Sequence, residues 1–561
     1  MRGCEVIARI LKLEGVEQVF CFPYTPILDA LAEEGIRPIV ARQERVAENM
    51  ADGYSRASNG RKLGVVTVQA SAGAENAFAG IAHASTDSSP LLVLPGHPGR
   101  AFAGVPPTFD AVKHYAAATR WADVLPSANR IPDRMRRAFT LLRSSRPGPV
   151  LLEVPADVAQ EEMTEPFAYR PVPRIRCGAD PDAVRDAVRL LLSAERPMIW
   201  AGQGVLYAEA SPEFVEVADL LAAPVMTTLL GKSAFPENHP LALGTGSYSR
   251  TAMVMDYLER SDALFAIGAS LTRTVFAPQV PSGKLIIHAT IDPRDLNKDY
   301  VADVPLLGDA KLVLRQMADE IRVQAGPKKG TGPLTSQVPS PFSGRRGAVV
   351  DHLASVKKRW RERWLPKLRS DEVPLNPYRV LGELMQLLDP VQCMVTHDSG
   401  NPRDQLVPLY EAVTPRGYLG WGHSTQLGFS LGLAMGAKLA APEKTVVNVM
   451  GDAAFGMVGM DLETAVRERI PILTVLLNNS AMGNYERMIP KATQLYRTKY
   501  LSGDYSLVAK GLGAHAERVD QPRDIAPALQ RALTATRAGT AALVEFITRE
   551  EGDLAIGSAN H

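Results

Sequence analysis

Short apolar runs alternate with longer amphipathic segments along most of this 561-residue chain. The runs, among them PLLVLPG, PVLLEVP, ALFAIG and TVVNVMGD, are rich in β-branched and aliphatic residues and end at Gly, Pro or Asp. Runs of this kind are typical of parallel strands that helices cover on both faces. Segments such as VAENMADGYSRAS and GMDLETAVRER lie between them and have helical spacing. The pattern predicts an α/β fold with doubly wound parallel sheets.

Two irregular segments divide the pattern into three parts. Residues 166–181 are rich in Pro, and residues 324–347 are rich in Gly, Pro and Ser, as linkers are. The charged stretch that follows, VKKRWRERWLPKLRSDE, is interpreted as a solvated helix face. We therefore expect three α/β domains, at 1–165, 180–323 and 373–561, with a linker at 324–372.

Composition narrows the function classes. The formal charge is +1, hydrophobic residues make up 46% and charged residues 22%, so nothing indicates a nucleic-acid surface. The four cysteines are far apart, which favours free thiols in a reducing compartment. No apolar run reaches membrane-spanning length, and the amphipathic start lacks the features of a signal peptide. We expect a cytoplasmic protein with no membrane partner.

Two neighbouring strand ends carry polar side chains that suit a metal ion. The run TVVNVMGD ends at Asp452, and the next run, ILTVLLNN, ends at Asn478 and Asn479. Parallel strands place such ends at one edge of a sheet, where ligands bind. Carboxylate and amide oxygens suit Mg²⁺, although Asp and Asn are also common turn residues. On these grounds alone, a metal site and a pair of turns both stay open.

The same spacing resembles a known cofactor motif. Gly-Asp-Ala, then 24 residues, then Asn-Asn is similar to the Gly-Asp-Gly and Asn-Asn motif of thiamine diphosphate enzymes. Residues 426–483 resemble the diphosphate domain of the acetolactate synthase and benzoylformate decarboxylase family. The resemblance covers nearly the full chain and implies three domains in the order pyrimidine, middle and diphosphate.

The resemblance implies a set of ligands for Mg²⁺ and the diphosphate. Asp452, the side chain of Asn479 and the backbone carbonyl of Ala481 would bind the metal. The residues that would line the cofactor in this domain are Asn401, Leu427, Gly451, Asp452, Ala453, Ala454, Asn479 and Ala481. In relatives the residue at Leu427 wedges the cofactor into a bent form. Pro402 and Arg403 depart from the acetolactate synthase pattern.

The N-terminal third resembles the pyrimidine domain of the family. The segment ARQERVAENMADG is similar to the family's strand–Glu–helix segment, which makes Glu44 the residue that activates the cofactor. Ser71, Gly73 and Asn76 match positions beside the pyrimidine. In this family the two domains that face one cofactor come from different subunits, so the resemblance implies a homodimer or homotetramer with the cofactor at the subunit interface.

Substrate contacts are expected from several segments. Ser88 falls where benzoylformate decarboxylase-like enzymes place a His, and Thr25 where they place a Ser, with Tyr24 beside it. His423 lies four residues before Leu427 and could act as an acid or base. Tyr485 lies in a segment that caps the substrate in relatives.

The leading hypothesis is decarboxylation of a 2-oxo acid with carboligation, as in acetolactate synthase. The alternatives are a 2-hydroxyacyl-CoA or oxalyl-CoA lyase, which would use an acyl-CoA substrate, and a simple 2-oxo acid decarboxylase. The middle domain could bind FAD or ADP, but of the family's Arg-rich segment only Arg273 is kept, and Asp292 fits a nucleotide-contacting acid. A non-catalytic relative of the fold is disfavoured because both Glu44 and Asp452 are present.

Overall fold

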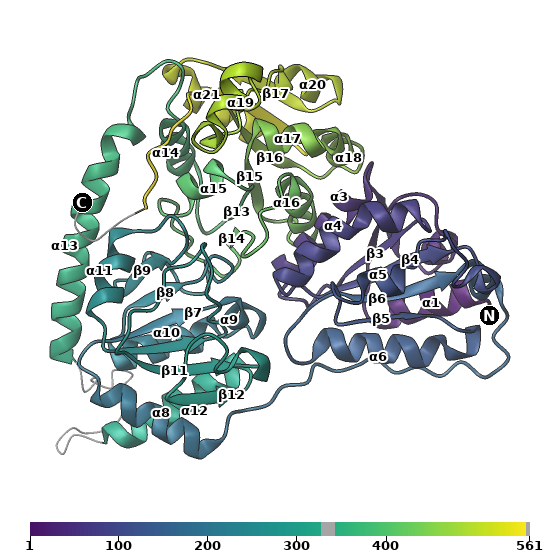
Figure 1. Ribbon diagram of the computed structural model, residues 1–561, viewed down its shortest axis with the longest axis horizontal. Coiled ribbons are helices and arrows are strands. Elements are labelled where there is room, and N and C mark those ends of the chain that lie inside the picture. Colours follow the sequence, from purple (N-terminus) through teal and green to yellow (C-terminus); the bar gives the residue numbers. More distant parts are fainter. Residues whose placement is uncertain (327–342, 557–561) are drawn as a thin grey trace.

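The computed structural model describes residues 1–326 and 343–556. In these residues it contains three six-stranded sheets, each all-parallel and flanked by helices, which confirms the predicted α/β class (Figure 1). Continuous apolar runs such as Val150–Pro155 form fully buried strands. The chain visits the three sheets one after another, so each sheet is the centre of one part of the molecule.

The N-terminal sheet has the strand order β2-β1-β3-β4-β6-β5. Its strands are β1 (Gln18–Cys21), β2 (Arg37–Val40), β3 (Gly64–Val68), β4 (Leu91–His97), β5 (Trp121–Val124) and β6 (Val150–Pro155). Its helices are α1 (Gly3–Leu13), α2 (Leu28–Glu33), α3 (Glu44–Ala57), α4 (Ala72–Thr86), α5 (Ala111–Tyr115), α6 (Ile131–Arg143) and α7 (Ala156–Gln160).

The middle sheet has the order β12-β11-β10-β7-β8-β9. Its strands are β7 (Pro197–Ala201), β8 (Val225–Thr227), β9 (Ala242–Thr245), β10 (Ala263–Ile267), β11 (Leu285–Thr290) and β12 (Val304–Leu307). Its helices are α8 (Pro181–Ser193), α9 (Gln203–Tyr207), α10 (Ser211–Leu221), α11 (Ala252–Arg260) and α12 (Ala310–Ala325).

The C-terminal sheet has the order β14-β13-β15-β16-β18-β17. Its strands are β13 (Cys393–His397), β14 (Tyr418–Leu419), β15 (Thr445–Gly451), β16 (Ile472–Asn478), β17 (His515–Val519) and β18 (Ala542–Ile547). Its helices are α14 (Pro377–Leu387), α15 (Asn401–Leu406), α16 (Phe429–Ala440), α17 (Asp452–Val458), α18 (Leu462–Arg467), α19 (Pro490–Tyr496), α20 (Tyr505–Gly511) and α21 (Ile525–Arg537).

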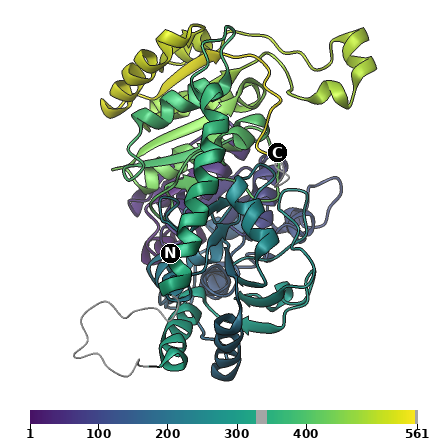
Figure 2. The same ribbon diagram turned by 90° about the vertical axis from the view of Figure 1, so that its left-hand side faces the viewer.

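Helix α13 (Ser343–Leu368) lies within the segment expected to be a linker, of which residues 327–342 fall outside the described residues. Figure 2 shows α13 running lengthwise along the middle and C-terminal parts. Trp364 is buried against Tyr378, with ring centroids 5.0 Å apart, while Arg359 and Arg361 are exposed. One face of this helix therefore packs between the two parts and the basic face meets solvent.

Helices α3 and α16 join the N-terminal part to the C-terminal part. Their backbones approach so closely that a Cβ at Gly436 would lie 1.8 Å from the carbonyl oxygen of Met50. Glycine is required there because any side chain would push the helices apart. This contact sets the position of Glu44, at the start of α3, relative to the C-terminal sheet.

No helix among the described residues is long and apolar enough to cross a membrane. All four cysteines are free thiols, and only Cys177 is exposed.

Candidate active site

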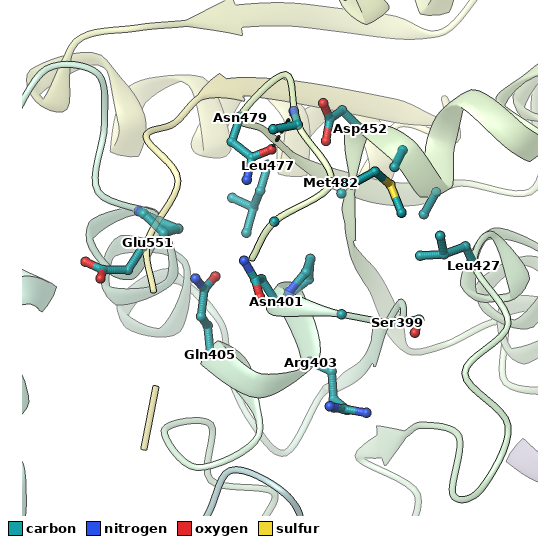
Figure 3. A pocket seen from close by; sticks show the side chains of 18 of the residues that line it. Ser399, Asn401, Arg403, Gln405, Leu427, Asp452, Leu477, Asn479, Met482 and Glu551 are labelled. Carbon is teal, nitrogen blue, oxygen red and sulfur yellow. Dashed lines mark hydrogen bonds between the residues drawn. The ribbon is translucent and has the colours of Figure 1, made fainter. Parts of the chain in front are cut away.

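A cavity of about 310 Å³ opens at the carboxyl edge of the C-terminal sheet (Figure 3). Strands β15 and β16 pair in register with Gly451 opposite Leu477, so the residues that follow each strand emerge side by side. All the cofactor-binding residues predicted in this domain line the cavity: Asn401, Leu427, Gly451, Asp452, Ala453, Ala454, Asn479 and Ala481. Tyr485, a predicted substrate residue, lines it as well.

Asp452 has the chemistry of a cation ligand. Its side chain is 3% exposed, and its Oδ2 atom has no hydrogen-bond partner among the described residues. Burial raises the pKa of this carboxyl to about 6, against hydrogen bonds from the backbone N–H groups of Ala453 and Ser480 that lower it. A buried carboxylate oxygen that borders a cavity without a partner fits a metal ion.

The two asparagines after β16 have different surroundings. Asn478 donates from Nδ2 to Glu545 Oε1 at 2.7 Å, which holds it inside the sheet. Asn479 faces the cavity, and its Oδ1 accepts from the backbone N–H of Ala481 at 3.0 Å. The donors available to a cation are therefore a carboxylate, an amide oxygen and a backbone carbonyl, which suit Mg²⁺. No group of three or more His, Cys, Asp or Glu side chains in the described part of the chain could hold a metal.

Small residues leave the cavity wall open for phosphate. A Cβ at Gly451 would meet nothing closer than the Cγ of Pro402, 3.7 Å away, so the space beyond it is free. Ala453, where relatives carry Gly, lies in α17 and has a negative φ, so alanine fits there without strain. These residues let a diphosphate approach the backbone closely.

The loop that carries Leu427 is held by two buried aspartates. Asp87 accepts from the backbone N–H groups of Gly422 and His423 at 3.0 to 3.1 Å. Asp398 accepts from the N–H of Gly428 at 2.9 Å, where the chain has a φ of +88°. Neither aspartate was predicted from the sequence, because each acts through hydrogen bonds to a loop that is distant along the chain. The Asp-Ser-Gly sequence after β13 was a signal for the second.

A second group of predicted residues surrounds Glu44 at the start of α3. Asn76 donates from Nδ2 to Glu44 Oε2 at 3.3 Å. A Cβ at Gly73 would lie 3.5 Å from Glu44 Oε1, and Ser71 is the N-terminal cap residue of α4. The structure thus brings Gly73 and Asn76 to Glu44, and Ser71 lies two residues before Gly73. Glu44 does not line the cavity around Asp452.

The predicted substrate residues separate into several places. Tyr24 is 72% exposed in the loop after β1, and the Thr25 hydroxyl beside it is buried without a partner among the described residues. Ser88 accepts from Arg146 Nε at 2.7 Å and lines a second cavity, of about 90 Å³, against the middle sheet. His423 lines this second cavity too, and burial lowers the pKa of its imidazole.

The cavities at the middle domain are small. A third one, also of about 90 Å³, is lined by Asp292 and shares Arg146 with the second. Asp292 is paired with Arg294 through three contacts of 2.7 to 3.2 Å, and Arg273 lines neither cavity. Cofactor-sized pockets measure about 300–1,000 Å³. Each cavity alone is smaller than this range, but the two adjoin, since Ser88, Gln203 and Gly268 line both.

Comparison with known proteins gives a consistent match along the chain. Residues 1–118 match the thiamine pyrophosphate enzyme N-terminal TPP binding domain, residues 184–317 the central domain, and residues 398–546 the C-terminal TPP binding domain. The chain is 29% identical to the acetolactate synthase isozyme 3 large subunit of Escherichia coli K12, over 96% of this chain and 93% of that one. It is 30% identical to the glyoxylate carboligase of Escherichia coli O157:H7, over 95% and 90%.

A solved structure from Mycobacterium smegmatis, described as a candidate thiamin diphosphate-dependent enzyme, has the same fold. Its TM-score is 0.80 with 23% identity, and the match covers 98% of this chain and 99% of that one.

Proposed function

The chain belongs to the acetolactate synthase family of thiamine diphosphate-dependent enzymes, and we propose that it decarboxylates a 2-oxo acid and joins the remaining fragment to a second carbonyl compound. The unpartnered oxygen of Asp452, in a cavity that contains Asn479 and Ala481, is the observation that best supports this proposal. Thiamine diphosphate supplies a nucleophilic carbon that adds to the substrate carbonyl and holds the electron pair left when carbon dioxide departs.

The residues of this chain would bind, orient and move protons. Asp452, Asn479 and the carbonyl of Ala481 would hold Mg²⁺, which neutralises the diphosphate. Gly451, Ala453 and Ala454 would leave room for the phosphate oxygens. Leu427 would support the cofactor from the side, since it lines the cavity and packs against the core shared by α3 and α16. Glu44 would hold or move a proton at the pyrimidine N1′ atom.

The separation of Glu44 from the cavity supports a shared site. In one chain Glu44 does not line the Asp452 cavity, so the proposed active unit is a homodimer in which Glu44 of a second copy faces the cavity. A homotetramer of two such dimers is compatible with the same geometry. Gel filtration with light scattering would contradict this part of the proposal if the active protein were a monomer.

An assay of several 2-oxo acids tests the proposed reaction. The protein would be incubated with thiamine diphosphate, Mg²⁺ and either pyruvate or glyoxylate, which is included because of the similarity to glyoxylate carboligase. Carbon dioxide release together with a coupled product, both lost in Asp452→Asn, is the expected result. Release of carbon dioxide with only an aldehyde as product would indicate a simple decarboxylase.

One observation favours a second candidate, an acyl-CoA lyase. A cavity of about 260 Å³, lined by Arg61, Arg143 and Arg174, shares Tyr207 and Asp309 with the third cavity described above. These arginines would suit the phosphates of an acyl-CoA. Cleavage of oxalyl-CoA or a 2-hydroxyacyl-CoA, with no turnover of 2-oxo acids, would establish this alternative in place of the first.

A further inference from the structure

Arg403 lies at the end of the large cavity that is opposite Asp452 (Figure 3). It belongs to the first turn of α15 and is only 5% exposed, yet it lines the cavity. A buried cation is costly unless its surroundings compensate the charge. Its presence here, where the sequence departs from the acetolactate synthase pattern, therefore requires an explanation.

The guanidinium of Arg403 is held by hydrogen bonds along one edge and by stacking on two aromatic rings. Asp404 accepts from its Nε at 2.5 Å and from its Nη2 at 2.6 Å. The Cζ atom lies 4.4 Å from the ring centroid of Trp421 and 5.4 Å from that of Phe276. No acceptor among the described residues is recorded for Nη1. The guanidinium is thus held rigidly, and its Nη1 is available to donate to a ligand. This is the arrangement of a preorganised anion site.

The distribution of charge along the cavity is uneven. Among the described lining residues the cations are Arg403 and Arg549. Arg549 is 42% exposed at its side chain and pairs with Glu372 and Glu551. Arg403 is the buried one, and Phe276, on which it stacks, lines both the large cavity and the second cavity. An anionic group that enters between the two cavities would meet Arg403.

We propose that Arg403 binds the carboxylate of the 2-oxo acid and so determines which substrates react. This inference rests on the proposed function, because it assigns the substrate's anionic group to one end of the same cavity. The metal and diphosphate would be held at the Asp452 end, which would leave the Arg403 end for the substrate. A charge-assisted hydrogen bond from a guanidinium that is already desolvated favours a carboxylate over a neutral group of equal size.

The test compares the KM of pyruvate with the inhibition constant Ki of methyl pyruvate, a neutral competitor in which a methyl ester replaces the carboxylate. The variants are Arg403→Met, which removes the charge, and Arg403→Lys, which keeps it without the planar fork. Because Arg403→Met leaves Asp404 buried and unpaired, the double variant Arg403→Met/Asp404→Asn is made as well. Arg531→Met is the matched control, since Arg531 makes an equivalent two-nitrogen contact to Glu517 on the exposed face of α21.

The expected result is a change in KM for the charged substrate alone. In Arg403→Met and in the double variant, KM for pyruvate rises by about 10- to 100-fold relative to Ki for methyl pyruvate. Arg403→Lys gives a smaller rise, and Arg531→Met gives none. Thermal melting with thiamine diphosphate and Mg²⁺ checks that each variant is folded.

Two results would overturn the assignment of Arg403. An unchanged ratio of the pyruvate KM to the methyl pyruvate Ki in the folded double variant would mean that the pair serves structure only. The second result is a larger dissociation constant for thiamine diphosphate, measured by tryptophan fluorescence, with no change in that ratio. It would mean that Arg403 holds the cofactor's phosphate. If the wild-type enzyme turns over neither pyruvate nor any other 2-oxo acid, the proposed function fails, and the inference fails with it.

Discussion

Asp452 and Glu48 are both buried carboxyl groups with oxygens that have no hydrogen-bond partner among the described residues, but their surroundings differ. Asp452 follows strand β15 as the first residue of α17 and borders the large cavity. Glu48 is one turn after Glu44 on α3, is fully buried, and lies under α4 where a Cβ at Gly80 would be 2.6 Å from its Oε2. Burial raises its pKa well above the ordinary value, with Glu44 and Asp52 adding to the rise. An unpartnered carboxyl therefore indicates a ligand site only where there is room for the ligand.

Replacing Glu44 with Gln should have the largest effect, because Glu44 is proposed to act on the cofactor, whereas Glu48, one turn later on α3, is not. A glutamine cannot give or take a proton at the pyrimidine, so turnover should fall by about 10²- to 10⁴-fold. The dissociation constant for thiamine diphosphate should change far less. Steady-state kinetics and fluorescence titration measure the two, and Glu33→Gln, an exposed residue of the same domain, is the control. Full activity in Glu44→Gln would remove Glu44 from the mechanism.

Asp452→Asn tests the other side of the comparison. Outer partners of metal ligands are worth about 10- to 100-fold in affinity, so loss of a ligand should weaken Mg²⁺-dependent binding of thiamine diphosphate by about 100-fold or more. Without cofactor, the Asp452→Asn variant should melt at a higher temperature than the wild-type protein without cofactor, because the variant no longer buries an unpaired charge. Calorimetric titration measures the cofactor affinity, and thermal denaturation measures the melting temperature.

The control for this prediction is Asp389→Asn, which changes a turn before β13 at the opposite edge of the same sheet. Unchanged cofactor affinity in Asp452→Asn would mean that the metal is held elsewhere.

The surroundings of Asp452 and Glu48 also show how much of the candidate site could be predicted from the sequence. The strand-end position of Asp452 and Asn479 was predictable, because apolar runs mark parallel strands and such strands place their ends together. Asn478 and Asn479 could not be told apart, since only the tertiary contact with Glu545 turns one inward. No local sequence feature indicates that Asp87 holds a distant loop. Equally, none indicates that Glu48 lacks a hydrogen-bond partner among the described residues. Such roles depend on contacts between helices that are far apart in sequence.

Glu48→Gln should change stability without changing cofactor binding. A carboxyl whose pKa is higher in the folded than in the unfolded state binds more protons when folded, so its contribution to stability is fully present below pH 4.5 and is lost as the pH rises through the raised pKa of the folded state. Glutamine has no such dependence. The free energy of unfolding of Glu48→Gln, relative to that of the wild type, should therefore increase by about 1.4 kcal/mol for each pH unit between the unfolded-state and folded-state pKa values of Glu48. Chemical denaturation at pH 5 and pH 7 measures it.

The outcome that contradicts this prediction is a gain that is the same at both pH values, which would mean that Glu48 is ionised or partnered in solution. Equal loss of thiamine diphosphate affinity in Glu48→Gln and Asp452→Asn would remove the distinction between the two carboxyls.

Gly80→Ala should have the smallest effect, and it tests whether the space around Glu48 is as limited as the contacts indicate. The new methyl group would fall 2.6 Å from Glu48 Oε2 and 2.9 Å from its Cβ, so α3 and α4 must move apart or Glu48 must rotate. Overpacking of this kind costs about 1–3 kcal/mol. Shortening the neighbour in Gly80→Ala/Glu48→Ala should recover part of that loss relative to Glu48→Ala alone, because alanine removes the carboxylate but keeps the Cβ that lies 2.9 Å from the new methyl group. If the two substitutions were instead additive, the closeness of α4 would not be what keeps a ligand away from Glu48, and the contrast with Asp452 would need a different cause.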